Sequence, residues 1–151
     1  ADLTEDSVLG NQVVVIGGGL VGCEQALHIA RDGHQVVILE MQEDLATDCV
    51  VTHRENLMHQ LQSCECIQIL TGARCTEITD TGVKVGRGGK EETIAADTVV
   101  LAAGMKADSE QVNQLRSIVP QTYVIGDCNQ AGKIMRAVRD AYDAVVDFGL
   151  F

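Results

Sequence analysis

The sequence has few aromatic and few basic side chains. Only 3% of its 151 residues are aromatic and none is Trp, which leaves little for nucleic acid bases to stack on. Eleven basic residues stand against 22 acidic ones, and the formal charge of -11 would repel both a phosphate backbone and anionic lipid headgroups. We therefore expect no nucleic acid partner and no membrane partner.

Long apolar runs and paired cysteines are also missing. No stretch approaches the roughly 20 apolar residues of a spanning helix, and the acidic start ADLTEDSVLG lacks the features of a secretory signal, so we expect a cytoplasmic protein. The six cysteines include no Cys-x-x-Cys or Cys-x4-Cys pair, which favours free thiols over a dithiol redox centre. We find no nucleophile with a partner base and no metal-ligand spacing, and expect neither a catalytic residue nor a metal site on this chain.

Short buried runs alternate with amphipathic segments along the first hundred residues. Continuous β-branched runs are typical of strands buried on both faces, and a strand, helix, strand unit of about 30 residues implies parallel pairing. Gly33 suits the left-handed position after a helix, and Asp48 suits an N-cap. We expect parallel strands at residues 12–16, 35–39, 66–70 and 97–102, and helices at about 20–32 and 48–62.

The pattern changes between the third and fourth of these strands. Three short segments, at residues 74–78, 83–85 and 92–94, are separated by turn residues and predict an antiparallel meander. Beyond residue 104 we expect a short helix near 110–116, a strand at 123–125 and a helix at 132–146. The predicted fold class is α/β, a Rossmann-like three-layer parallel sheet with an antiparallel β-meander crossover.

A glycine fingerprint, Gly17-x-Gly19-x-x-Gly22, directly follows the first strand and opens the first helix. In such a loop the first glycine makes the tight turn, the second lets a pyrophosphate approach the backbone, and the third lets the helix pack on the strand. The helix N-terminus adds unpaired N–H groups and a partial positive charge. The sequence therefore predicts a dinucleotide site formed by Gly17, Gly18, Gly19, Leu20, Val21 and Gly22.

Glu40 closes the second strand about 20 residues after the fingerprint, where a carboxylate accepts hydrogen bonds from the adenosine ribose. This carboxylate would repel a 2'-phosphate, and residues 41–47 contain no Lys or Arg to bind one, so we expect NAD(H) rather than NADP(H). We place Met41 beside Glu40 in the cofactor site. Since FAD also binds such loops, the fingerprint alone does not choose between nicotinamide and flavin.

Three stretches resemble the pyridine nucleotide-disulfide oxidoreductase superfamily. VVVIGGGLVGCEQALHIA at residues 13–30 resembles its NAD-binding domain, and VVLAAG at 99–104 is similar to the turn that leads from the NAD domain back to the FAD domain. Residues 123–145 resemble its C-terminal flavin motif. The resemblance implies cofactor contacts for Glu24 on the nicotinamide side, for Ala103 and Gly104 at the turn, and for Gly126 and Asp127 with FAD.

The finer resemblance is to the C-terminal half of the old-yellow-enzyme-like iron-sulfur flavoproteins: 2,4-dienoyl-CoA reductase, enoate reductase, and trimethylamine dehydrogenase with its NADH oxidase relatives. It rests on Asp127-Cys128, followed by Lys133-Ile134-Met135 and an Ala-rich helix, although residues 129–132 replace the usual acidic-proline step. It implies a parent protein whose missing N-terminal domains carry FMN, an iron-sulfur cluster and the first flavin loop. In the isolated chain, we expect Asp127 to cap the last helix.

The resemblance assigns residues 1–104 to an NAD(H)-binding Rossmann domain and residues 105–151 to the C-terminal segment of the FAD-type domain, packed on the same fold. In the parent, NADH held here would pass hydride to a flavin for reduction of an activated alkene or a related acceptor, whereas the isolated chain would be inactive. Two alternatives stay open. One is a fragment of a disulfide-reductase-type NADH oxidase or ferredoxin reductase, and the other is a non-catalytic, redox-sensing NAD-binding module.

Overall fold

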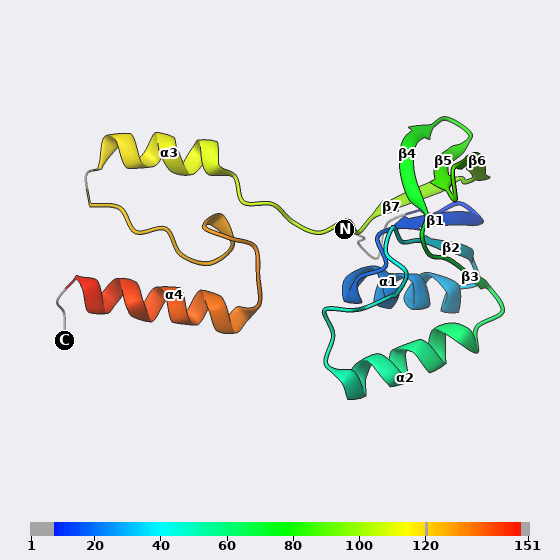
Figure 1. Ribbon diagram of the computed structural model, residues 1–151, viewed down its shortest axis with the longest axis horizontal. Helices are drawn as coiled ribbons and strands as arrows, with labels where there is room; N and C mark the ends of the chain where they lie inside the picture. Colours follow the sequence, from blue (N-terminus) through cyan, green and yellow to red (C-terminus); the bar gives the residue numbers. More distant parts are fainter. Residues whose placement is uncertain (1–7, 120, 149–151) are drawn as a thin grey trace. The chain divides into compact units, whose positions relative to one another are not determined.

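The chain divides into two units, residues 1–104 and residues 105–151. The computed structural model describes residues 8–119 and 121–148 of them (Figure 1). Within these described ranges, the first unit contains both strands and helices, and the second contains helices without a strand. None of the described helices is long and apolar enough to span a bilayer.

A parallel sheet of four strands forms the centre of the first unit. Its strands lie in the order β3-β2-β1-β7, so the first strand of the chain is an inner one, paired on both sides. Val14 of β1 lies opposite Val37 on one neighbour and Val99 on the other. The bounds of the four strands are β1 Gln12–Ile16, β2 Gln35–Leu39, β3 Ile67–Leu70 and β7 Thr98–Leu101.

Two helices, α1 (Leu20–Arg31) and α2 (Val51–Gln62), lie on one face of this sheet (Figure 1). Since successive side chains of a strand point to opposite faces, Val13 and Val15 of β1 join the core that these helices form. The predicted helix end at Gly33 is confirmed, with a φ of 96° directly after the C-cap residue.

An antiparallel meander covers the opposite face of the sheet (Figure 1). Its strands are β4 (Arg74–Thr79), β5 (Gly82–Arg87) and β6 (Lys90–Ala95), with β5 in the middle. Val14 of β1 packs there with Val83 and Val85 in a second core. The predicted fold class, a three-layer arrangement with a meander crossover, is therefore confirmed.

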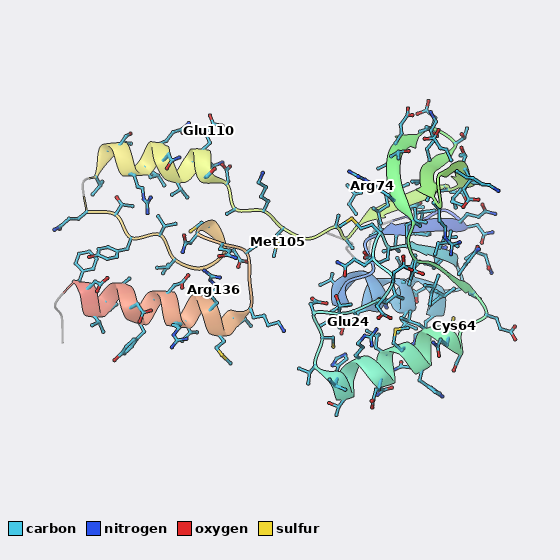
Figure 2. All side chains as sticks on the ribbon, in the orientation of Figure 1. Glu24, Cys64, Arg74, Met105, Glu110 and Arg136 are labelled. Atoms are coloured by element: carbon cyan, nitrogen blue, oxygen red, sulfur yellow. The ribbon has the colours of Figure 1, made fainter. Side chains whose placement is uncertain are left out.

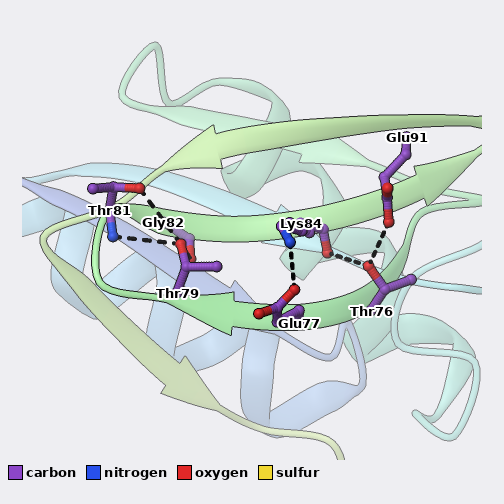
Figure 3. Close-up of polar contacts among 7 residues, drawn as sticks. All are labelled: Thr76, Glu77, Thr79, Thr81, Gly82, Lys84 and Glu91. Atoms are coloured by element: carbon purple, nitrogen blue, oxygen red, sulfur yellow. Dashed lines mark hydrogen bonds and ion pairs between the residues drawn. The ribbon is translucent and has the colours of Figure 1, made fainter.

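Polar side chains of the meander contact one another and the backbone of neighbouring strands (Figure 3). The ammonium group of Lys84 pairs with the carboxylate of Glu77 on the adjacent strand. The hydroxyl of Thr79 donates to the carbonyl of Gly82 across the β4–β5 turn, at 3.0 Å. These groups are exposed or half-buried, so the apolar side chains beneath them carry most of the stabilisation.

The second unit contains α3 (Ser109–Ile118), a short 3-10 helix η1 (Gly126–Cys128) and α4 (Ile134–Asp147). The Asp108 carboxylate caps α3 by accepting hydrogen bonds from two backbone N–H groups in its first turn. The rings of Tyr123 and Phe148 contact each other with their centroids 4.5 Å apart. Both helices expected in this part of the chain are present.

Three predictions about local structure are wrong. Helix α2 begins at Val51 with Val50 as its N-cap residue, so Asp48 is not its cap. No strand forms at residues 123–125: the backbone is extended at Ile125, but no strand of the described second unit is there to pair with it. Helix α4 has Lys133 as its N-cap residue, so Asp127 does not cap it.

Candidate dinucleotide-binding site

The turn after β1 requires glycine at both ends of the fingerprint. Gly17 has a φ of 110°, and a Cβ atom there would overlap the carbonyl group of Ala102 at the end of β7. A Cβ atom on Gly22 would overlap the carbonyl oxygen of Gly17, because α1 lies directly against the turn. These two glycines are therefore explained by backbone geometry alone.

Gly19 differs from both because its surroundings are open. Its φ of -67° and ψ of 178° suit any residue. Among the described residues beyond its immediate chain neighbours, the one atom within 4 Å of the place that a Cβ atom would occupy is Oδ1 of Asp48, at 3.9 Å. The first backbone bond of α1 runs from the N–H of Cys23 to the carbonyl of Gly19. The N–H groups of Leu20 and Val21 thus precede the helical ladder and have no acceptor inside the helix, which is typical of a helix N-terminus that binds a phosphate.

Glu40 lies at the end of β2 and is only 9% exposed. Its Oε2 accepts a hydrogen bond from the N–H of Gly18 at 2.7 Å, and its Oε1 accepts one from the N–H of Gln42 at 2.8 Å. The carboxylate therefore holds the glycine loop to the end of the neighbouring strand. Each oxygen keeps a further lone pair for a ribose hydroxyl, and the predicted contact with a ribose stays a prediction.

The segment after Glu40, residues 41–50, folds back over the glycine loop. The N–H of Ala46 donates to the carbonyl of Gly18 at 2.8 Å, and the buried side chain of Leu45 lies against Gly18. Arg54 of α2 fixes this segment by donating from Nε to the carbonyl of Leu45 at 2.8 Å. The segment brings the Asp48 carboxylate to the start of α1, where Oδ1 accepts from the N–H of Leu20 at 3.3 Å.

Cys23, in the first turns of α1, is a structural thiol. Its side chain is fully buried and its Sγ donates to the carbonyl of Gly18 at 3.3 Å. Burial, and then the negative charge of Glu40, raise the pKa of the Cys23 thiol to about 12. The group thus remains protonated at neutral pH and is a poor nucleophile.

The remaining predicted residues of the first unit lie around the same loop or beside it. Ala103 and Gly104 follow β7, whose end is joined to that of β1 by the bond from the N–H of Ala102 to the carbonyl of Ile16. Met41 follows Glu40 with 68% of its surface exposed. Glu24 is on α1 (Figure 2), and its Oε1 lies 3.5 Å from Nε2 of His53 on α2.

Gly126 and Asp127 lie in the second unit, where both support a turn before α4. The N–H of Gly126 donates to Oδ2 of Asp140 at 3.2 Å, and Oδ1 of Asp127 accepts from the N–H of Gly132 at 3.1 Å. Gly126 has a φ of 64°, which favours glycine at this position. Their predicted contact with FAD stays a prediction.

Two contacts were not predicted from the sequence: Glu40 with Gly18, and Asp48 with Leu20. Each joins residues more than 20 positions apart, so no local pattern signals it. Among the residues that the structure describes, no three His, Cys, Asp or Glu side chains gather to hold a metal ion. The chemistry of this site is therefore that of backbone N–H groups and two carboxylates.

Comparison with known proteins agrees with this geometry. The family model described as pyridine nucleotide-disulphide oxidoreductase matches residues 1–144. The chain is 33% identical over 145 residues to cinnamate reductase of Clostridium sporogenes, with 93% of this chain and 22% of that protein covered. It is 41% identical over 133 residues to NADH oxidase of Thermoanaerobacter brockii, with 87% of this chain and 20% of that protein covered.

Solved structures point the same way. A complex of 2-naphthoyl-CoA reductase with 2-naphthoyl-CoA superposes with a TM-score of 0.78 at 31% identity, with 91% of this chain and 21% of that chain covered. This chain thus spans about a fifth of the length of the relatives it matches. The resemblance drawn from the sequence is confirmed: the chain belongs to the pyridine nucleotide-disulphide oxidoreductase family.

Proposed function

We propose that this chain is the NADH-binding portion of a flavin-dependent oxidoreductase. The observation that carries the proposal is the open space over Gly19, which faces the N-terminus of α1 while the glycines on either side are closed in by neighbouring atoms. Such a space admits a pyrophosphate and leaves the fold of the loop unchanged. The residues present therefore fit a dinucleotide.

Each residue of the site has a defined task in binding. The N–H groups of Leu20 and Val21 donate to the pyrophosphate, and the α1 dipole adds a favourable field. Glu40 holds Gly18 in place and accepts hydrogen bonds from the ribose hydroxyls. Its negative charge disfavours a 2'-phosphate, which makes NADH the preferred form over NADPH.

The chain's residues bind and orient, while the cofactors supply the reaction. When bound, NADH supplies a hydride from its nicotinamide ring to a flavin of the parent protein. Glu24 lies on the first turns of α1 and is the candidate for contact on the nicotinamide side, with His53 as its present partner. Ala103 and Gly104 border the loop from the end of β7.

We further propose that the parent reduces an activated alkene or a related acceptor. The support comes from relatives whose names are cinnamate reductase and 2-naphthoyl-CoA reductase, although this chain covers only 22% and 21% of them. In this proposal FMN and an iron-sulfur cluster lie on parent domains outside this chain. FAD binds to the FAD-type domain, to which residues 105–151 belong.

Helix α4 carries large apolar side chains that its own unit does not cover. Ile134 and Met135 are each 83% exposed, and Val138 and Tyr142 on the same helix are also exposed. Large apolar side chains that stand together in this way mark a surface that contacts another protein part. We propose that the rest of the FAD-type domain covers them, with Gly126 and Asp127 facing its flavin.

Titration calorimetry of the full 151-residue chain with NADH, NADPH and FAD tests this function. We expect NADH to bind more tightly than NADPH, and FAD not to bind. Gly19→Ala places a methyl group in the open space without clash, so the fold should persist while NADH affinity falls by about tenfold or more, which is about 1.4 kcal/mol.

Gly86→Ala is the matched control for this substitution. A Cβ atom at Gly86, on β5 of the meander, also meets nothing closer than 3.8 Å, and the position is away from the glycine loop. This variant should bind NADH as the unchanged chain does. Wild-type affinity in Gly19→Ala would contradict the proposed site, and tight FAD binding without NADH binding would show that the loop binds the other dinucleotide.

A further inference from the structure

The carboxylate of Asp48 lies where the proposed pyrophosphate would bind. Its Oδ1 accepts from the N–H of Leu20 at 3.3 Å and is the atom closest to the open space over Gly19. Helix α1 has no acidic residue of its own in the first turn. The negative charge at this helix N-terminus therefore comes from a residue 28 positions away in the chain.

The position of Asp48 is set by the loop that carries it. Ala46, two residues earlier, donates to the Gly18 carbonyl at 2.8 Å, and it has a φ of 49°, a conformation uncommon for residues other than glycine. The side chain of Leu45 is only 2% exposed, and its carbonyl is bound by Arg54. A loop fixed at these points holds Asp48 beside the start of α1.

We infer that Asp48 sets the affinity of the site for its dinucleotide by competing with the pyrophosphate for the N-terminus of α1. This role rests on the proposed NADH-binding function and concerns the same site. The incoming pyrophosphate displaces the carboxylate from the Leu20 N–H or binds beside it and is repelled. Either way Asp48 weakens the complex and speeds release of the nucleotide.

Removal of the charge should therefore tighten binding. An anion at a helix N-terminus changes stability by an amount that corresponds to about a two- to fivefold change in an equilibrium constant. We expect Asp48→Asn and Asp48→Ala to bind NADH about two- to fivefold more tightly than the unchanged chain, with slower dissociation. Because Asp48 is exposed, the difference should shrink between about 0.02 M and 0.5 M salt.

Glu43→Gln is the matched control. Glu43 is an exposed carboxylate of the same loop, and its side chain lies near Gly72 rather than at Gly19. Its substitution removes the same charge without altering the contact with Leu20. Calorimetry and stopped-flow dissociation of NADH from the full chain and the three variants, at both salt concentrations, give the comparison.

Each result has a defined meaning. Tighter, salt-sensitive binding by both Asp48 variants but not by Glu43→Gln supports the inference. Unchanged or weaker binding by the Asp48 variants, or equal tightening by Glu43→Gln, overturns it and leaves the proposed function standing. Failure of the unchanged chain and all variants to bind NADH, with folding verified by circular dichroism, overturns the proposed function and this inference with it.

Discussion

Substitution of Glu40 by Gln tests whether this carboxylate organises the glycine loop before any nucleotide binds. The change keeps the size of the side chain but replaces one acceptor oxygen with an NH₂ group, which would face the N–H of Gly18 or of Gln42. A hydrogen bond to a charged group contributes about 1.5–3 kcal/mol. Since at least one such bond is lost at a site only 9% exposed, we expect the first unit to lose about 1.5–3 kcal/mol of stability.

Urea unfolding followed by circular dichroism measures this loss, with Glu43→Gln as the reference for the same chemical change at an exposed position three residues later. The reference should change stability by less than about 0.5 kcal/mol. In the same preparations, Glu40→Gln should also lower NADH affinity, because Gly18 is less well held. A loss below about 0.5 kcal/mol for Glu40→Gln would refute the structural role of this carboxylate.

Three further predictions follow from the same unit. Gly22→Ala should cost about 1–3 kcal/mol in urea unfolding, because its Cβ atom overlaps the Gly17 carbonyl and α1 must move. With its pKa raised from 9.0 to about 12, the Cys23 thiol keeps its proton in the folded chain while the unfolded chain loses it. The free energy of unfolding should therefore fall as pH rises above 9, by up to about 1.4 kcal/mol per pH unit. Urea unfolding at a series of pH values measures this fall, which should be smaller in Cys23→Ala. Arg54→Met should free residues 41–50 and speed their amide hydrogen exchange, with β5 of the meander unchanged.

Much of the first unit could be predicted because its signals are local. A run such as Gln12–Ile16 has no polar face, so it suits only a strand covered on both sides, and Gly33 marks the end of its helix by a steric rule. The fingerprint glycines follow a steric rule as well, because a Cβ atom at Gly17 or Gly22 would overlap a backbone carbonyl group. These features depend on a few neighbouring residues and on backbone sterics.

The errors occurred where a partner outside the segment decides the outcome. The β-branched and aromatic residues at 123–125 favour a strand, but extended backbone becomes a strand only beside another, and the described second unit provides none. Asp48 has the residue type of an N-cap, yet α2 begins three residues later, at Val51. In each case the local preference was real and a longer-range arrangement overrode it.

The sequence by itself determined the alternation of strands and helices, the glycine turn and the presence of a carboxylate after β2. The tertiary structure alone decided what the two carboxylates contact: Glu40 holds Gly18, and Asp48 lies at the start of α1. Both contacts depend on how residues 41–50 fold back over the loop, which is set by packing of Leu45 and the bond to Arg54. Hydrogen bonds between distant residues arise from packing of this kind, so no periodicity or spacing in the chain encodes them.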